Sequence, residues 1–403
     1  MKTKLTALLL VLGMLLCLSG CGGAGTGAQA GETADGDASD ATANAAQEDA
    51  DDPYAASYAA HAPDEIVLTI NGEGVTWAEY FYCLYANASQ IADLGQSDWN
   101  TDASAIDSAA AGQTLQEYIR TRIEEGIFLP YWSIEQKAGE LGVTLTEEDQ
   151  AEIDRYYQQT VDSYFGGDEQ AFLDDLAKNY FPVDFFNRMN AIDYLYMKLY
   201  EQTFGKDGAD LPEEDALSYA GDGGYIQAKH ILFKTVDDNN EPLPEEETAA
   251  KKADAEAVLA ELRDITAPEE LCARFDELIE EKGEDPGMKT YTQGYVFPDG
   301  VMVPEFRAAA EELGEYEVSD LVETSYGYHI ILRLPLDVDA PEMSNGYGTS
   351  MRTLAAEALF STMTEEWFDA AKLVYGEGFE AMDFNELIPL PVAAKTETGE
   401  TVD

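Results

Sequence analysis

The sequence has few of the residues from which metal centres and disulfide scaffolds are built. Its 403 residues contain four cysteines and three histidines, namely Cys17, Cys21, Cys83, Cys272, His61, His230 and His329. Cysteines so few and so far apart form neither a disulfide-stapled scaffold nor a zinc site. We therefore expect the protein to use no metal and no cofactor.

Positive charge is also scarce. The chain has 23 Lys and Arg residues against 80 Asp and Glu residues, which gives a formal net charge of −57. A polyanion repels phosphate and has few cations with which to displace counterions, so nucleic acid is not an expected partner. Hydrophobic residues still make up 45% of the chain, which is enough for the cores of roughly two or three domains.

The first twenty residues have the pattern of an export signal. Two lysines, Lys2 and Lys4, precede an apolar run that ends in Leu18-Ser-Gly-Cys21. This ending resembles the lipobox of bacterial lipoproteins, in which the peptide is cut before the cysteine and the thiol carries a diacylglycerol. The resemblance implies a signal peptide over 1–20 and lipidation of Cys21. A plain secretory signal is the alternative, and a retained membrane helix is disfavoured because the apolar run is short for a bilayer.

The next segment lacks the residues that form a core. From Gly22 to Glu65 there is no Val, Ile, Leu, Met, Phe or Trp, and no Lys or Arg. Such a segment cannot bury enough apolar surface to offset the entropy lost on ordering. We predict a disordered acidic tether over 21–64, in which His61 has no role, and a disordered tail over 391–403.

Helical patterns dominate the stretch 65–212. A short strand near its start is followed by Thr76-Trp-Ala-Glu79, which is typical of a capping box. An apolar stripe then continues at helical spacing through Trp77, Phe81, Leu84, Ala88 and Ile91. Further helices are predicted at about 113–141, 146–165, 168–180 and 183–204. The aromatic residues on these stripes are interpreted as core.

The pattern changes after Phe204. The stretch 205–224 is acidic, contains Gly and Pro, and is interpreted as a linker. Strands are predicted at about 225–233, 295–297, 318–324 and 327–334, with helices at about 245–263, 268–282 and 305–313. This order predicts a small α+β unit.

Three blocks within this unit resemble the signature blocks of parvulin-type peptidyl-prolyl isomerases. They are Ala228-Lys-His-Ile-Leu232, Gly300-Val-Met-Val-Pro-Glu-Phe306 and Val322-Glu-Thr-Ser-Tyr-Gly-Tyr-His-Ile-Ile331. They occur in the order of that family and at about its spacing, and the resemblance covers about 225–335. It implies a parvulin-like domain, a four-stranded antiparallel sheet with helices, over 213–340.

The arrangement around this unit is similar to the PrsA/SurA group of extracytoplasmic foldases. In that group, sequence on both sides of the isomerase unit packs into one chaperone body. The implied fold is α+β, with the parvulin-like domain inserted between a helical part at 65–212 and a C-terminal helix within 341–390. That helix has an apolar face without a partner in its own segment, formed by Met351, Leu354, Leu359, Met363, Trp367 and Phe368.

The chemistry of proline isomerisation indicates which side chains are needed. Rotation about an X-Pro bond meets a barrier of ~18–20 kcal/mol set by amide resonance, and no bond has to break. A catalyst must hold the proline ring in an apolar socket and favour the twisted state. Met302 and Phe306, at positions i and i+4, would line such a socket, with Phe297 beneath.

The family resemblance implies the polar part of the site. It makes His230 and His329 a hydrogen-bonded pair behind the pocket floor, and places Asp285 close to the substrate carbonyl. Thr324 matches a hydroxyl near the histidines, and Tyr326 lies beside the proline site. Each of these residues also has a purely structural interpretation. The histidines would be a hydrogen-bonded pair in the core, Asp285 a solvated carboxylate on a loop, and the socket residues ordinary core.

Three functions remain open from the sequence. The first is a lipid-anchored isomerase and foldase on the extracytoplasmic face of the cell membrane, in a bacterium of the Gram-positive type. Its partners would be unfolded exported polypeptides with X-Pro bonds. The second is a holdase with a degenerate parvulin domain, because Tyr291-Thr-Gln-Gly294 replaces the Gly-Gly-Asp-Leu-Gly of many parvulins. The third is a solute-binding lipoprotein, which would need a two-lobed α/β body that the helices at 76–204 do not supply.

Overall fold

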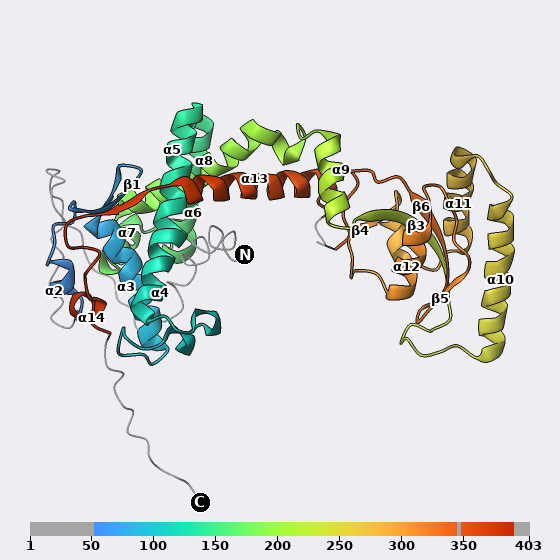
Figure 1. The fold of residues 1–403 in the computed structure, drawn as a ribbon, viewed down its shortest axis with the longest axis horizontal. Helices are drawn as coiled ribbons and strands as arrows, with labels where there is room; N and C mark the ends of the chain where they lie inside the picture. The colour runs from blue at the N-terminus through green and yellow to red at the C-terminus, as the bar shows by residue number, and fades with distance from the viewer. Residues whose placement is uncertain (1–51, 345–347, 391–403) are drawn as a thin grey trace, which may run out of the picture. The chain divides into compact units, whose positions relative to one another are not determined.

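The computed structural model describes residues 52–344 and 348–390. The predicted signal peptide, Cys21, most of the tether and the predicted tail lie outside the described residues. The chain divides into two compact units (Figure 1). The first contains residues up to Leu199 and from Met363 onward, and the second runs from Tyr200 to Thr362.

The first unit is a set of helices with a small sheet. Its elements are α2 (Ala55–Tyr58), β1 (Ile66–Ile70), β2 (Glu73–Thr76), α3 (Trp77–Asp93), α4 (Leu115–Ile123), a π-helical turn (Glu124–Phe128), α5 (Leu129–Leu141), α6 (Glu147–Phe165), α7 (Glu169–Lys178), β7 (Leu373–Tyr375) and α14 (Phe384–Leu387). Two longer helices, α8 (Val183–Phe204) and α13 (Met351–Ala370), contain the points at which the units divide.

Helix α3 begins as its sequence predicts. The Thr76 hydroxyl accepts a hydrogen bond from the Glu79 amide, and the Glu79 carboxylate accepts one from the Thr76 amide, which is a complete capping box. The predicted stripe is buried along its whole length, at Trp77, Phe81, Leu84, Ala88 and Ile91. The prediction for this helix is therefore confirmed.

The C-terminal segment contributes a strand to the first unit. Strand β1 lies in the middle of a three-stranded sheet and pairs antiparallel with both β2 and β7. The hydroxyl of Tyr375, on β7, donates to the buried carboxylate of Glu124, and Trp99 donates its indole N–H to the Ile388 carbonyl over 2.8 Å. The contacts from this end of the chain are therefore made by a strand and a loop as well as by a helix.

The predicted tether is wrong from residue 52 onward. Tyr54 is buried, the Tyr58 carbonyl accepts a hydrogen bond from the Trp77 indole over 2.8 Å, and the His61 ring lies 4.7 Å from the Trp77 ring between centroids. The composition of this segment does not reveal its order, because two tyrosines and a histidine supply the apolar surface that aliphatic residues usually supply.

The second unit is built on a four-stranded sheet. Its elements are α9 (Glu213–Asp222), β3 (Ile226–Lys234), α10 (Glu245–Arg263), α11 (Pro268–Lys282), β4 (Tyr295–Phe297), α12 (Pro304–Glu312), β5 (Val322–Thr324) and β6 (Gly327–Leu334). The strand order is β4-β3-β6-β5, and every pair is antiparallel. The predicted fold class, α+β with a four-stranded antiparallel sheet, is confirmed.

Helices cover both faces of this sheet (Figure 1). Helices α10 and α11 pack on the face that carries Tyr328 and Lys229, since Lys252 lies over the Tyr328 ring and Lys229 is paired with Asp276. Alternation along β3 turns His230 to the opposite face, where Phe306 of α12 meets it. The histidines therefore lie between the sheet and α12.

The predicted linker is also wrong in part. Residues 213–222 form α9, and Leu211, Ala216 and Ala220 are buried in a small core together with Met351 and Ala355 of α13. Alanines are too small to give a strong hydrophobic pattern, so an acidic helix that buries them has the composition of a linker.

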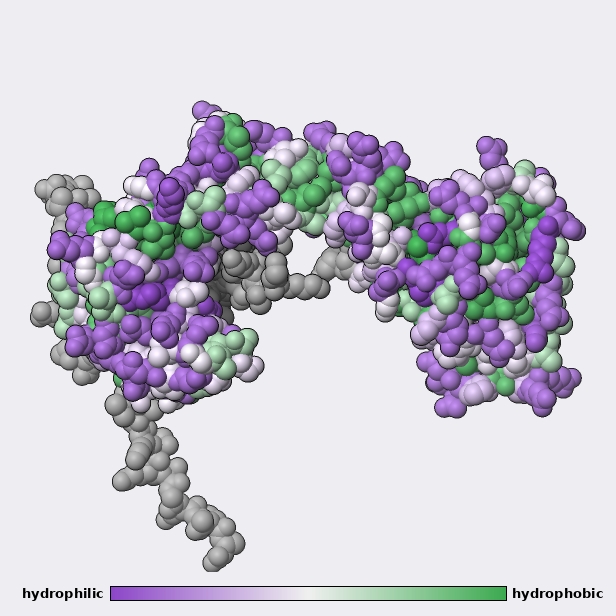
Figure 2. Space-filling view, in the orientation of Figure 1, coloured by the Kyte–Doolittle hydropathy of each residue, from purple (hydrophilic) through white to green (hydrophobic). Residues whose placement is uncertain are grey.

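Hydrophilic residues cover most of the face shown in Figure 2, as the net charge of −57 leads one to expect. Within residues 52–344 and 348–390, no helix combines the length and the apolar character that crossing a membrane requires.

Candidate functional site

Two histidines on neighbouring strands form the centre of the site. The register pairs His230 with Ile331 and Leu232 with His329, so the two imidazoles lie diagonally on the same face of the sheet. Their Nδ1 atoms are 3.0 Å apart, and both side chains are buried. The structure thus brings together the pair that the sequence predicts.

Asp285 approaches the pair from the loop after α11. One of its carboxylate oxygens, Oδ2, lies 2.7 Å from Nε2 of His230 and accepts a hydrogen bond from the Tyr295 hydroxyl over 2.6 Å. Gly287 makes this approach possible, because a Cβ atom at that position would lie only 1.8 Å from the Tyr295 oxygen. The glycine is therefore required by the packing of the site.

Thr324 bonds the other end of the pair. Its hydroxyl oxygen lies 2.8 Å from Nε2 of His329 and accepts a hydrogen bond from the Tyr326 amide over 3.1 Å. Thr324 ends β5 and Tyr326 lies in the turn that follows it, so this turn and the loop at Asp285 meet at the histidines. All four predicted polar residues lie in one hydrogen-bonded row.

The charges along the row follow from its environment. Burial alone would raise the pKa of Asp285, but the hydrogen bonds from His230 and Tyr295 outweigh it and lower that pKa to about 2. Burial, with help from the neighbouring His230, lowers the pKa of His329 to about 3. At neutral pH the carboxylate is therefore ionised and the His329 ring is neutral.

The charge on Asp285 fixes the direction of one of these hydrogen bonds. An ionised Asp285 requires a proton on Nε2 of His230, because a carboxylate only accepts. In the bond between the two Nδ1 atoms and in the bond between His329 and Thr324, the donor is set by which ring nitrogens carry protons.

Aromatic rings lie against the row. The Phe306 ring is edge-on to both imidazoles, with centroids 5.2 Å from His230 and 5.5 Å from His329, and Phe297 lies 6.0 Å behind it. Phe306 is 2% exposed and Phe297 is fully buried. Met302 is half-buried against the same core, and Tyr326 is 47% exposed. Of the four predicted substrate residues, only Met302 and Tyr326 present substantial surface.

Tyr295 is a further residue of the site, and it was not among the residues predicted from the sequence. Burial and the bond to the ionised Asp285 raise the pKa of its hydroxyl, which therefore stays protonated as a donor. Tyr295 precedes Phe297 by two residues in a predicted strand, so both side chains had to share one face. This spacing in the sequence could have placed Tyr295 on the face of the sheet that carries Phe297.

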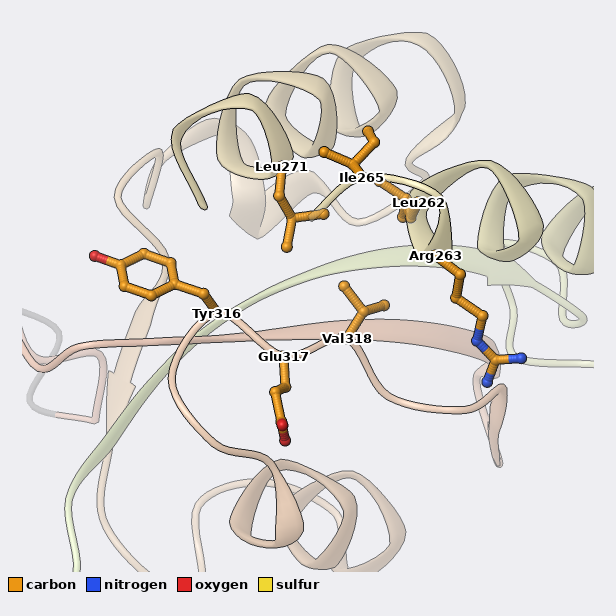
Figure 3. Close-up of a pocket in the computed structure, with 7 residues that line it drawn as sticks. All are labelled: Leu262, Arg263, Ile265, Leu271, Tyr316, Glu317 and Val318. Carbon is orange, nitrogen blue, oxygen red and sulfur yellow. The ribbon is translucent and has the colours of Figure 1, made fainter. Parts of the chain in front are cut away.

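A separate depression of about 270 Å³ lies elsewhere in the second unit (Figure 3). It is lined by Leu262, Arg263, Ile265, Leu271, Tyr316, Glu317 and Val318. None of the predicted site residues lines it, so it is distinct from the histidine site.

Comparison with known families agrees with the geometry. Residues 230–334 match the family model of the rotamase, or PPIC-type peptidyl-prolyl isomerase, domain. The chain contains a PPIC-type isomerase domain. The matched segment begins at His230 and includes Asp285, Phe306, Thr324 and His329, so the whole row described above belongs to the isomerase domain.

Similarity to curated proteins extends beyond the isomerase domain. The foldase protein PrsA of Halalkalibacterium halodurans is 30% identical over 189 residues, 45% of this chain and 50% of the relative. The foldase protein PrsA of Caldanaerobacter subterraneus subsp. tengcongensis is 24% identical over 277 residues, 66% of this chain and 72% of the relative. The chain thus spans about half the length of the first relative and more of the second.

Solved structures are similar at a lower level. The crystal structure of PrsA from Bacillus subtilis is 18% identical, with 76% of this chain and 91% of that chain covered and a TM-score of 0.23. Values this low support no conclusion about mechanism.

Proposed function

We propose that this protein is a peptidyl-prolyl cis-trans isomerase and foldase that assists the folding of exported polypeptides. The observation that carries the proposal is that an apolar side chain, Phe306, packs against the hydrogen-bonded row that includes the charged Asp285. Phe306 packs edge-on against both histidines, and the row ends in the ionised carboxylate of Asp285. The similarity to foldases over more than the isomerase domain supports the same proposal.

In this proposal the apolar side chains hold the proline ring. Met302 and the exposed Tyr326 make the first contacts, and Phe306 closes the floor beneath them. Excluding water from the imide disfavours its planar, more polar form. Each ~1.4 kcal/mol by which the site favours the twisted state over the planar state gives a tenfold rate increase.

In this proposal Asp285 acts through the electrostatic field of its carboxylate at the substrate carbonyl. A planar amide places more negative charge on the carbonyl oxygen than a twisted one, because resonance delocalises the nitrogen lone pair. A carboxylate close to that oxygen therefore destabilises the planar state. His230, His329 and Thr324 position the carboxylate and keep it ionised, and we assign them no contact with substrate.

Membrane attachment is part of the proposal. The lipobox ending at Cys21 supports a lipid anchor, and the acidic segment behind it would hold the folded part away from an anionic surface. The protein would then meet unfolded chains on the extracytoplasmic face of the membrane as they emerge from export.

A holdase remains the second candidate, because two observations favour it. The floor of the site is closed, with Phe297 and Phe306 almost fully buried, and the loop at Tyr291–Gly294 differs from that of many parvulins. A site that proline cannot enter would bind unfolded chains without accelerating isomerisation. Nothing in the described residues favours the solute-binding lipoprotein.

The test is the refolding of a protein whose slow phase is limited by proline isomerisation. The fragment from residue 52 onward, added in catalytic amount, should accelerate that phase. A holdase would suppress aggregation at stoichiometric amounts and leave the rate unchanged. A small solute that raises the melting temperature of the fragment, with neither effect on refolding, would instead support the solute-binding lipoprotein.

A further inference from the structure

Residues 54–61, here called the strap, lie against an aromatic face of the first unit. The strap has the sequence Tyr-Ala-Ala-Ser-Tyr-Ala-Ala-His, and its two tyrosines are the only Phe, Trp or Tyr residues between positions 22 and 65. The aromatic face consists of Trp77, Phe81 and Tyr85, which follow one another at i, i+4 and i+8 on α3, together with Tyr180.

Every aromatic ring of the strap contacts this face. Tyr54 lies 5.3 Å from Tyr85 between ring centroids, Tyr58 lies 5.1 Å from Phe81 and 5.0 Å from Tyr180, and His61 lies 4.7 Å from Trp77. The strap backbone also bonds to the face, since the Trp77 indole donates to the Tyr58 carbonyl over 2.8 Å.

The strap has little stability of its own. Its helix, α2, is four residues long, far below the length at which an isolated helix persists in water. Ala56, Ala59 and Ala60 are exposed, so the strap is held by its rings and by a few hydrogen bonds. The strap therefore depends on this face for its conformation.

Most of this surface is carried by a helix with its own stabilising contacts. Trp77 and Phe81 project from α3, a helix of 17 residues with a complete capping box. Tyr180 is held at a φ of 58°, a conformation that bulky residues rarely adopt, and its ring lies 5.0 Å from Phe81 and 5.1 Å from Tyr85. Strained residues of this kind are concentrated at binding sites.

We propose that the aromatic face is a binding site for unfolded polypeptide segments that carry aromatic residues, and that the strap is its exchangeable internal ligand. This inference rests on the proposed function in one respect, that the protein acts on unfolded chains. The occupant seen in the structure indicates the chemistry of the partner, which is an extended or one-turn segment with two aromatic rings about four residues apart.

The same contacts explain why such segments would be selected. Removing the strap exposes the Trp77 and Phe81 rings, which are fully buried when it is in place. The free-energy cost of exposing the two rings is offset only by a segment that covers them again. A segment without aromatic rings and with few aliphatic residues buries too little apolar area to do so. The strap is covalently attached and so has a high effective concentration, which sets an affinity that a client must exceed.

Binding of a synthetic peptide to the full chain tests the proposal. The probe is an unstructured Gly/Ser-rich peptide with two phenylalanines four residues apart, and its control has serines at both positions. The Phe peptide should bind and the Ser peptide should not. In Tyr54→Ala/Tyr58→Ala the Phe peptide should bind at least tenfold more tightly than in wild type, while Tyr54→Phe/Tyr58→Phe should resemble wild type.

Hydrogen exchange keeps the test valid if the double alanine variant fails to fold. In wild type, saturation with the Phe peptide should release the strap, so the amides of Tyr58 and Ala59, which bond to Tyr54 and Ala55, should exchange faster. Unchanged exchange at saturation, or equal binding of the Phe and Ser peptides, would overturn the proposal. Isomerase activity lies in the other unit, so its presence or absence does not decide this result.

Discussion

Tyr295 donates its hydroxyl to the same oxygen of Asp285 that faces His230, over 2.6 Å and 2.7 Å respectively. Two donors therefore converge on one carboxylate oxygen in a half-buried position. This convergence keeps the negative charge of Asp285 in place close to the apolar floor.

Tyr295→Phe removes one of these donors without removing the ring. The pKa of Asp285 should rise toward the usual range of an aspartate, because one of the bonds that stabilise its charged form is lost. A hydrogen bond to a charged group contributes about 1.5–3 kcal/mol to stability. The free energy of unfolding should therefore fall by a measurable amount, up to about this value, in the variant. Carboxyl carbon chemical shifts in a pH titration report the pKa.

The matched control is Tyr291→Phe. The Tyr291 ring lies 5.3 Å from the Tyr295 ring but belongs to the altered loop and does not bond to Asp285. An unchanged Asp285 pKa in Tyr295→Phe, or an equal shift in both variants, would contradict the assigned role of Tyr295.

The second unit should lose stability in mild acid. The pKa of His329 is lowered to about 3 in the folded state and is about 6.5 in an unfolded chain. A lowered folded pKa gives stability that is complete above pH 6.5 and is lost as the pH falls from 6.5 toward 3. The lowered pKa of Asp285 removes further stability only below about pH 4.

The placement of tryptophan separates the two units in this experiment. All four tryptophans, Trp77, Trp99, Trp132 and Trp367, belong to the first unit. Denaturant unfolding of the second unit should therefore appear in circular dichroism without a change in tryptophan fluorescence. His329→Gln should flatten the pH dependence of that transition, and an equally steep dependence in the variant would refute the assignment.

The first unit should depend on the end of the chain. Ending the protein after Ala371 removes β7, the Tyr375 hydroxyl that bonds to Glu124 and the Ile388 carbonyl that bonds to Trp99. Leaving a buried carboxylate and a buried indole N–H short of partners costs about 1–3 kcal/mol each. Tryptophan fluorescence should show unfolding at lower denaturant, whereas a chain ending at Leu390 should behave as the full chain does. Equal midpoints would contradict the prediction.

The anchor prediction depends on a single thiol. Cys21→Ser should abolish lipidation, so that the protein accumulates as unprocessed precursor or is released from the membrane. Metabolic labelling with a fatty acid and detergent partitioning both report this. A mature, acylated Cys21→Ser protein would show that the lipobox interpretation is wrong.

The sequence predicted most of the second unit, with the exception of α9, because the hydrophobic patterns of its elements are local. Helices α10 and α11 and strand β4 have the predicted bounds, since their hydrophobic periodicity is regular. The row of Asp285, His230, His329 and Thr324 was predicted through the resemblance to the parvulin family, because residues 99 positions apart carry no local signal of contact.

The failures have a common physical cause. Strand β7 is three residues long, and the strap and α9 are held through tyrosines or alanines, so none has a strong hydrophobic pattern. The burial of Phe306 also could not be predicted from its i, i+4 spacing to Met302, which fits a cleft wall and a core equally well. Long-range packing decided each of these cases.

The most direct test of the isomerase proposal is proline-limited refolding with Met302→Ala and Met302→Leu. Met302 is half-buried, so its truncation should leave the fold intact, whereas Phe306→Ala would open a cavity that costs about 3–5 kcal/mol. The account predicts acceleration by wild type, acceleration close to that level by the leucine variant, and a loss of roughly tenfold or more in the alanine variant. Full acceleration by a folded Met302→Ala protein, or none by wild type, would contradict it.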